Sequence, residues 1–499
     1  MKLGLQHSWA GLPPLMYSAL APVPVADPHC VVFNTALANE LGLDAEALAA
    51  QAAQLFSGNG LPEDAQPLAM AYAGHQFGGF SPRLGDGRAH LLGELIDPQG
   101  RRHDLHLKGS GATPYSRGGD GRAALGPMLR EYLVSEAMHA LRIPSTRSLA
   151  VLTTGEAVLR EDGPLPGAIL VRTAASHLRV GSFQYPASRG DLDTLRALVD
   201  YAIARHDPQA AGADVPALAL LQAVAQRQAQ LIAHWLRVGF VHGVMNTDNM
   251  ALSGETIDYG PCAFLDEYDA QKVFSSIDHQ GRYAFANQPL LAQWNLARLA
   301  ETLLPLINPD ADAAVAQAVQ VLEPFPSQVQ ALYHEHLRRK LGLPGDSADD
   351  TQLGLDLLQL MQHCQADHTL TFRELADAAD EAPDATRRRE AALASLQQQL
   401  QADPLGWTQW HQRWTQRLAS AALGPGERSA AMRRHSPAFI PRNHQVEAAL
   451  ASASTHGDLG EFHRLLQVVR RPYDDQPDNL HYAQPPLPDQ RVTRTFCGT

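Results

Sequence analysis

The sequence predicts a mixed α+β fold in two lobes, with strands concentrated before residue 190 and helices after it. Alternating apolar and polar residues predict a strand at 104–108, and short strand-like stretches predict further strands at 89–96, 148–153 and 168–172. Apolar residues at helical spacing predict helices at 195–206, 217–238, 293–307, 314–322 and 327–341. With 45% hydrophobic residues, the 499-residue chain can bury a substantial core.

Composition excludes several classes of protein. A net charge of −13 argues against a general nucleic-acid binder, which usually carries a basic surplus. No run approaches the roughly 18 apolar residues that a membrane span needs, and prolines interrupt the apolar part of the N-terminus, unlike a secretory signal. The four cysteines are too few and too scattered for a disulfide framework or a zinc site. We therefore expect a cytoplasmic protein with no nucleic-acid or membrane partner.

A glycine turn precedes the first long strand. Gly85 and Gly87 flank one residue and are followed by Arg88. Such a turn can bring backbone amides and a cation against phosphates, although it is equally typical of an ordinary hairpin. Lys108 follows about 20 residues later, on the strand face opposite Leu105 and Leu107. It is either a phosphate-binding lysine or an exposed strand lysine.

A polar, glycine-rich loop at 109–121 leads to a predicted helix at 127–141, which has two apolar faces and so should be largely enclosed. Glu131 aligns with one face and Glu136 with the other. Protein kinases use a glutamate on such a helix to hold their strand lysine. Spacing does not choose between the two glutamates, and either could instead form a local contact.

Arg172 and Arg179 lie seven residues apart. If the linker at 173–178 were helical, the two guanidinium groups would share a face and could grip phosphate oxygens together. Surface arginines on a helix are the alternative interpretation.

The stretch 239–260 follows the predicted helix at 217–238. Asp248, Asn249 and Asp258 present oxygen atoms there from two arms of a predicted short hairpin, with a turn at residues 253 and 254. Hard divalent cations such as Mg²⁺ take ligands of this kind. The alternative is a loop in which these side chains satisfy backbone amides.

The same stretch matches part of a protein-kinase catalytic site. Kinases carry H-R-D-x-x-x-x-N followed by D-F-G, and here His242, Asn249 and Asp258 occupy the His, Asn and second Asp positions. Val244 stands where the catalytic Asp belongs, and Asp248 lies beside the Asn instead. The metal-binding half is therefore retained while the usual base is missing.

Several further motifs occur in order: GHQFGG, GGDGR, REYLVSEAM, VRTAASHLRVGSFQ, HGVMNTDNM and TIDYGP. With them the chain resembles the selenoprotein O family (SelO, or YdiU), strongly over residues 70–300 and more loosely at both ends. The resemblance implies a bilobal protein-kinase-like fold with N- and C-terminal elaborations. It also implies transfer of AMP from ATP to Ser, Thr or Tyr hydroxyls of proteins, with ATP flipped relative to a kinase and pyrophosphate released.

The resemblance assigns roles to individual residues. Asp248 would take the proton from the acceptor hydroxyl, and Asn249 and Asp258 would hold Mg²⁺, or Mn²⁺ in its place. The positions expected to contact the nucleotide directly or to support those contacts are Gly85, Gly87, Arg88, Lys108, Asp120, Gly121, Glu131, Arg172, Arg179 and Asp258.

Two other functions fit the same residues. An ordinary kinase would transfer the γ-phosphoryl group through Asp248. A catalytically inactive scaffold would bind nucleotide and partners, which Val244 favours and the retention of Asn249 with Asp258 disfavours.

We expect four segments: an N-terminal extension at 1–65, a first lobe with nucleotide-binding loops at 66–188, a second lobe with the catalytic loop at 189–345, and a helical elaboration at 346–499. The proline-rich tail from Asp474 should lack regular structure. Cys497 stands where some relatives carry selenocysteine and could be redox-active or inert. Cys262 is the only thiol near the segment that follows Asp258.

Overall fold

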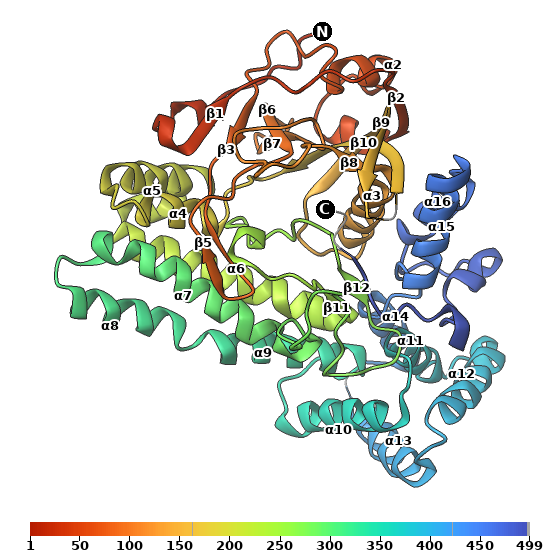
Figure 1. Cartoon of the computed structure of the whole chain (residues 1–499). Helices are drawn as coiled ribbons and strands as arrows, with labels where there is room; N and C mark the ends of the chain where they lie inside the picture. The colour runs from red at the N-terminus through yellow and green to blue at the C-terminus, as the bar shows by residue number, and fades with distance from the viewer. Residues whose placement is uncertain (162, 422, 497–499) are drawn as a thin grey trace.

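The computed structural model describes residues 1–161, 163–421 and 423–496. One large sheet is built from the first third of the chain, and helices make up most of the remainder (Figure 1). The predicted α+β composition is therefore confirmed.

The sheet has eight strands, with β8 pairing off the main path and the others in the order β1-β3-β6-β7-β10-β9-β2. Its members are β1 Tyr17–Ala19, β2 His29–Phe33, β3 Leu68–Met70, β6 Ala89–Ile96, β7 Arg102–Lys108, β8 Ala123–Ala124, β9 Arg147–Arg160 and β10 Gly163–Ala174. Both edge strands come from the first 65 residues. This segment, expected to be an extension, is therefore part of the sheet.

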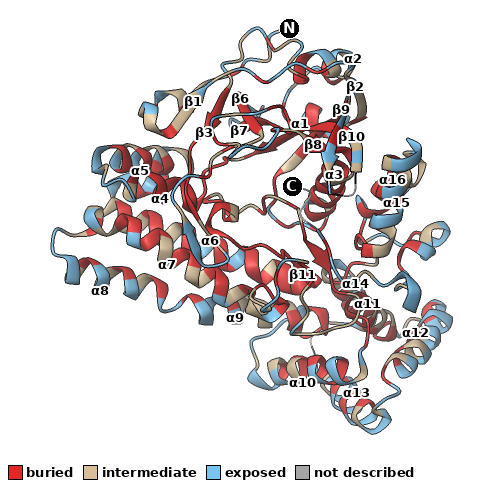
Figure 2. Cartoon of the chain, viewed as in Figure 1, coloured by how far each residue is buried: buried red, intermediate tan, exposed pale blue. Residues whose placement is uncertain are grey.

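The two faces of the sheet pack against different helices. Leu105 and Leu107 point into a core shared with α1 Thr35–Glu40 and α2 Ala45–Phe56. On the opposite face lies α3 Leu125–Ala140, which is buried along most of its length (Figure 2). The period of two in β7 places His106 and Lys108 away from the leucines.

The helical half is centred on α6 Pro216–Val238, which packs against α7, α8 and α9. Each predicted helix is found and begins a few residues earlier than expected; α7 does so because Pro289 is tolerated in a first turn. The helices of this half are α4 Val180–Ala187, α5 Leu192–His206, α6, α7 Gln288–Ile307, α8 Ala311–Leu322 and α9 Phe325–Lys340. Among the helices of the described chain, none is both long and apolar enough to cross a bilayer.

The C-terminal helices form a second core and then return to the sheet. A cluster that includes Trp407, Trp410 and Trp414 joins α10 to α14, whereas α15 and α16 pack on α3. These helices are α10 Ala348–Cys364, α11 His368–Ala378, α12 Thr386–Gln399, α13 Pro404–Ala419, α14 Pro425–His435, α15 Asn443–His456 and α16 Gly460–Val469.

The described part of the tail holds short 3₁₀ turns and one bridge, in which the Thr495 N–H donates to the Phe274 carbonyl at 2.7 Å. Cys497 lies outside the described residues.

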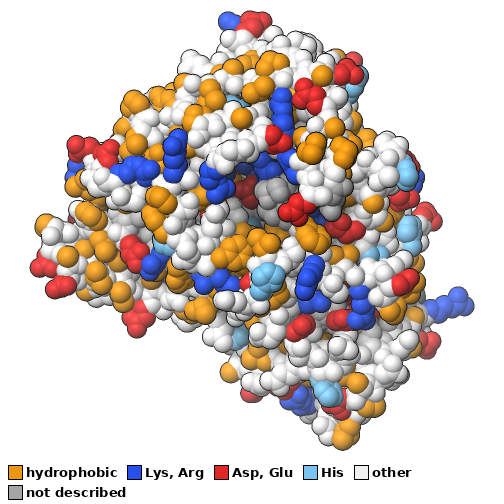
Figure 3. Space-filling model, in the orientation of Figure 1, with side chains coloured by type: hydrophobic (Ala, Val, Ile, Leu, Met, Phe, Trp, Pro, Cys, Tyr) orange, Lys and Arg blue, Asp and Glu red, His pale blue; other side chains and the backbone are white. Residues whose placement is uncertain are grey.

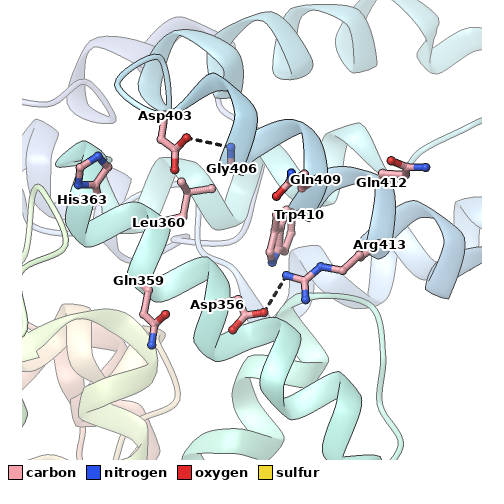
Figure 4. A pocket seen from close by; sticks show the side chains of 10 residues that line it. All are labelled: Asp356, Gln359, Leu360, His363, Asp403, Gly406, Gln409, Trp410, Gln412 and Arg413. Carbon is pink, nitrogen blue, oxygen red and sulfur yellow. Dashed lines mark hydrogen bonds and ion pairs between the residues drawn. The ribbon is translucent and has the colours of Figure 1, made fainter.

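A cavity of about 730 Å³ opens between α10 and α13, with Trp410 and the Asp356–Arg413 ion pair on its walls (Figure 4). None of the site residues predicted from the sequence lines it.

Candidate active site

Three cationic side chains converge on Asp258. Lys108 Nζ and Arg172 Nη1 donate to Asp258 Oδ1 at 2.7 and 2.8 Å, and Arg179 Nη1 donates to Oδ2 at 3.1 Å. Burial alone would raise the pKa of Asp258, but the charges of Lys108, Arg172 and Arg179 hold it well below its usual range. Asp258 is therefore an anion at neutral pH, held by groups from β7, β10 and the residue before α4.

The structure separates the two glutamates of α3. Lys108 Nζ donates to Glu131 Oε2 at 2.6 Å, and Arg172 Nη1 donates to Glu131 Oε1 at 2.8 Å. Glu136 instead accepts from Arg147 Nε at 2.7 Å. Because five residues of helix place the two side chains on different sides, only Glu131 reaches the cationic group.

The linker between Arg172 and Arg179 is not helical, so the two arginines do not share a helix face. Arg172 lies within β10, an irregular segment follows, and Arg179 directly precedes α4. Two backbone amides of this segment donate to distant carboxylates instead of forming helical bonds: Ala175 N to Glu255 Oε2 at 3.0 Å and His177 N to Asp104 Oδ2 at 2.7 Å. The arginines meet because the end of the strand and the start of the helix both approach Asp258.

The prediction of a hairpin in 239–260 is wrong. Its arms pair with other segments, Ala251 with Arg179 and Thr256 with Ser145. The turn itself is present, since the Gly254 amide donates to the Ala251 carbonyl at 3.2 Å. Local sequence does not show these distant backbone partners. Asp248 and Asn249 lie in a short 3₁₀ turn, and a two-stranded sheet joins β11 Phe240–Val241 to β12 Ala263–Phe264.

Asp248 is a buried carboxyl group with one unused oxygen. Gln76 Nε2 donates to its Oδ2 at 3.2 Å, while Oδ1 has no hydrogen-bond partner within the described residues. A Cβ added at Gly74 would lie 2.8 Å from that Oδ1, so the glycine is needed there. Burial raises the pKa of Asp248 to about 6, against the opposing charge of Arg179. The group is thus suited to accepting a proton near neutral pH.

The donor set fits a hard divalent cation. Asn249 Nδ2 donates to the Val244 carbonyl at 3.0 Å, which leaves its Oδ1 as the atom available to a ligand. Together with Asp258 and the unused oxygen of Asp248, it presents the carboxylate and amide oxygens that Mg²⁺ and Mn²⁺ prefer. Among the described residues, no cluster of three or more His, Cys, Asp or Glu side chains could hold a metal by itself. Phosphate oxygens or water would complete such a site.

The glycine turn is shaped by a neighbouring loop. Gly85 has φ +84, and a Cβ there would overlap the ring of Tyr115. A Cβ at Gly87 would lie 2.8 Å from the Tyr115 carbonyl oxygen. The amides of Asp86 and Gly87 donate to carbonyl groups of this chain. Contact between these glycines and phosphates stays a prediction.

The remaining predicted positions lie on the loops around β7. The Arg88 carbonyl accepts from the Gly109 amide at 2.7 Å. Asp120 pairs with Arg160 at 2.9 Å, and the Gly121 carbonyl accepts from the Gly111 amide at 3.0 Å. Their roles toward a nucleotide are likewise predictions.

Sequence reasoning missed two buried residues behind the cations. His106 Nε2 lies 3.1 Å from Asp86 Oδ2, and Arg172 Nε donates to His106 Nδ1 at 3.2 Å. Since Nδ1 accepts, the ring carries its proton on Nε2 and donates it to Asp86. The shared strand face of His106 and Lys108 was a signal that could have found the histidine.

A second missed contact involves an aromatic ring. The Arg179 guanidinium lies 4.6 Å from the centre of the Tyr72 ring, a cation–π contact that helps to hold the side chain in place. No spacing in the sequence indicated it.

Figure 3 shows a hollow in one face of the molecule with basic and acidic side chains around it.

Comparison with known proteins finds close relatives over the whole chain. A family described as "Protein adenylyltransferase SelO" matches residues 1–470. The chain is 57% identical to a protein nucleotidyltransferase YdiU of Rhizobium etli (strain CIAT 652), over 99% of this chain and 97% of the relative. It is 56% identical to the YdiU of Rhizobium meliloti (strain 1021), over 99% of both chains. It is 54% identical to the YdiU of Bradyrhizobium sp. (strain ORS 278), again over 99% of both.

Proposed function

Because the chain belongs to the SelO family of protein adenylyltransferases, we propose that it transfers AMP from ATP to Ser, Thr or Tyr hydroxyls of proteins. We also propose that its sheet and its helices act as the two lobes of a kinase-like fold. The Lys108–Glu131 pair supports this arrangement, since kinases join a strand lysine to a helix glutamate in the same way.

In the proposed reaction, the acceptor oxygen forms a bond to the α-phosphorus of ATP. The bond from that phosphorus to the oxygen bridging to the β-phosphate breaks, and pyrophosphate leaves with the electron pair. Asp248 takes the hydroxyl proton. Its buried, partly unsatisfied carboxyl supports this role, and Arg179 Nη1 fixes its backbone by donating to the Asp248 carbonyl at 2.9 Å.

The cationic side chains would bind the phosphate groups. Lys108, Arg172 and Arg179 hold Asp258 here, and they would share their hydrogen bonds between that carboxylate and phosphate oxygens. A divalent cation held by Asn249 and Asp258 would supply further neutralisation of the phosphate charge.

The convergence on Asp258 is the observation that carries the proposal. The three cations face three nearby anions, Asp258, Glu131 and, 3.8 Å from Arg179, Asp86. Adding a divalent cation to this balanced group would leave a positive surplus, which a triphosphate would neutralise.

ATP labelled at either the α- or the γ-phosphate tests the proposal. We expect label in protein from the α position only, with release of pyrophosphate. Asp248→Asn should lower the rate by about 10²–10⁴-fold, and Asp258→Ala by at least about as much, because charge neutralisation dominates this chemistry.

Label from the γ position alone would assign kinase activity instead. The buried Val244 in place of the usual Asp favours a third outcome, an inactive nucleotide-binding scaffold. Nucleotide binding without any labelled protein would establish that outcome.

A further inference from the structure

A short hairpin beside the catalytic turn exposes two aromatic rings. It consists of β4 Gly74–Gln76 and β5 Gly79–Ser81. Phe77 and Phe80 are 39% and 43% exposed, a large fraction for such side chains. Phe77 also has φ +52, which is uncommon for a residue with a large side chain. Exposure and backbone strain together suggest that this tip serves something other than stability.

The hairpin is bonded directly to the turn that carries Asp248. The His75 amide donates to Thr247 Oγ1 at 2.7 Å, and the Phe77 amide donates to Asn246 Oδ1 at 3.1 Å. Among the side chains that the structure describes, Gln76 Nε2 supplies the one hydrogen bond to the Asp248 carboxyl. Asp248 therefore lies between this hairpin and Arg179 of the cationic cluster.

A second loop adds a cation to the same surface. Tyr283 donates through its hydroxyl to Asn246 Oδ1 at 2.7 Å, and its ring centre lies 5.1 Å from that of Phe77. The neighbouring Arg282 guanidinium carbon lies 3.9 Å from the position of a Cβ on Gly78, at the hairpin tip. It also lies 4.9 Å from the centre of the Trp294 ring.

The surface continues onto α7. The His75 ring joins Phe80 to Trp294, with centroid distances of 4.9 and 5.2 Å. Leu290, one helical turn before Trp294, is 63% exposed. Figure 3 shows hydrophobic side chains at the edge of the hollow.

We propose that Phe77, Phe80, Arg282 and Trp294, here called the hairpin platform, bind the acceptor polypeptide. An apolar side chain of the acceptor packs on the phenyl rings, and an acidic residue near its hydroxyl pairs with Arg282. This inference rests on the proposed function and names the class of acceptor: a hydroxyl flanked by apolar and acidic residues. Phe77 and Phe80 are exposed, and Arg282 and Trp294 are half-buried beside them. Aromatic and arginine side chains are enriched in protein interfaces, and the platform is continuous with the turn that holds Asp248.

Two fluorescent peptides test the platform by direct binding, measured as anisotropy. Each has a single Tyr, flanked by Leu and Asp in one peptide and by Ser and Lys in the other. We expect the Leu/Asp peptide to bind at least about fivefold more tightly, and Phe80→Ser to weaken its binding by a similar factor. Arg282→Glu should reverse the preference between the peptides.

Leu405→Ser is the matched control, because Leu405 is 67% exposed and lies on α13, one of the C-terminal helices. It should bind both peptides as the wild type does. The affinity of Phe80→Ser for Mg²⁺-ATP, measured on the same samples, distinguishes a local loss of docking from a damaged nucleotide site.

Three results would overturn the platform. They are equal affinity for the two peptides, no binding of either peptide up to millimolar concentration, and a Phe80→Ser variant that binds the Leu/Asp peptide as tightly as the wild type does. A dimer of the chain that Phe80→Ser dissociates would also overturn it, since a second copy would then be the occupant. Peptide binding as expected, without AMP transfer to the bound peptide, would contradict the proposed function and leave the platform standing.

Discussion

His106 Nδ1 accepts a hydrogen bond from Arg172 Nε at 3.2 Å, so a buried imidazole orients one of the three cations on Asp258. The other ring nitrogen donates to Asp86, whose side chain is almost fully buried. The ring thereby links the strand that carries Lys108 to the glycine turn.

His106→Phe should keep the ring volume and remove both hydrogen bonds. We expect a loss of about 1–3 kcal/mol in unfolding free energy, because Asp86 loses a buried partner. We also expect the variant's KM for ATP to be higher than that of the wild type. Denaturant unfolding and steady-state kinetics measure the two effects. The control His103→Phe, on the same strand but paired with Asp97 rather than Asp86, should leave the KM for ATP near the wild-type value. A purely structural His106 would lower stability without changing that KM.

The two glutamates of α3 should have separable effects. Glu131→Gln removes the anion that faces Lys108 and Arg172, so we expect weaker binding of Mg²⁺-ATP, by about tenfold or more. Glu136→Gln removes the partner of Arg147 and should lower the unfolding temperature while leaving ATP affinity close to wild type. Calorimetric titration and thermal unfolding of both variants make the comparison. Equal losses of ATP affinity would show that the Lys108–Glu131 contact has no special role.

Stability should depend on pH through Glu255. Burial raises the pKa of this carboxyl to about 7, against hydrogen bonds from Ser253 Oγ and the Ala175 amide. The folded state therefore binds a proton more tightly than the unfolded state. The stabilisation is complete below the ordinary pKa of 4.5 and is lost as the pH rises to about 7.

At about 1.4 kcal/mol for each pKa unit, the loss should reach about 3 kcal/mol. Glu255→Gln imitates the protonated form and should lack this decline, so its unfolding free energy should exceed that of the wild type at pH 8. Glu390→Gln, an exposed control on α12, should follow the wild-type curve. Parallel curves for Glu255→Gln and wild type would contradict the assignment.

Metal binding should require nucleotide. The chain supplies Asn249, Asp258 and at most one further oxygen from Asp248, too few ligands to hold Mg²⁺ tightly without phosphate groups. We expect Mg²⁺ alone to change the unfolding temperature little, and Mg²⁺ with ATP to raise it clearly. At 100 times the dissociation constant the stabilisation is about 2.7 kcal/mol.

Asn249→Ala should reduce the effect of Mg²⁺ on ATP binding more than it reduces the binding of metal-free ATP. Thermal unfolding with each component alone and together provides the measurement. Strong stabilisation by Mg²⁺ without ATP would contradict the shared site.

Regular elements were largely predictable because their patterns are local. The strand at 89–96 is found with the predicted bounds, and the helix at 217–238 begins one residue early, at Pro216. The polar stretches were not predictable in this way. A hairpin was predicted for 239–260 and the conformation of 173–178 was left open, and backbone groups in both segments bond to partners far along the chain.

The sequence by itself determined the α+β composition, the membership of the family and the residue types available for phosphates and metal. Spacing left Glu131 and Glu136 open while the family resemblance pointed to Glu131, and the tertiary structure shows that Glu131 faces Lys108. Only the tertiary structure decided that Asp258 receives three cations. It alone showed the unused oxygen of Asp248 and the exposed rings of the hairpin platform. The physical reason is distance along the chain: Lys108 and Asp258 are separated by 150 residues. Such contacts depend on how the sheet and helices pack, which no local spacing encodes.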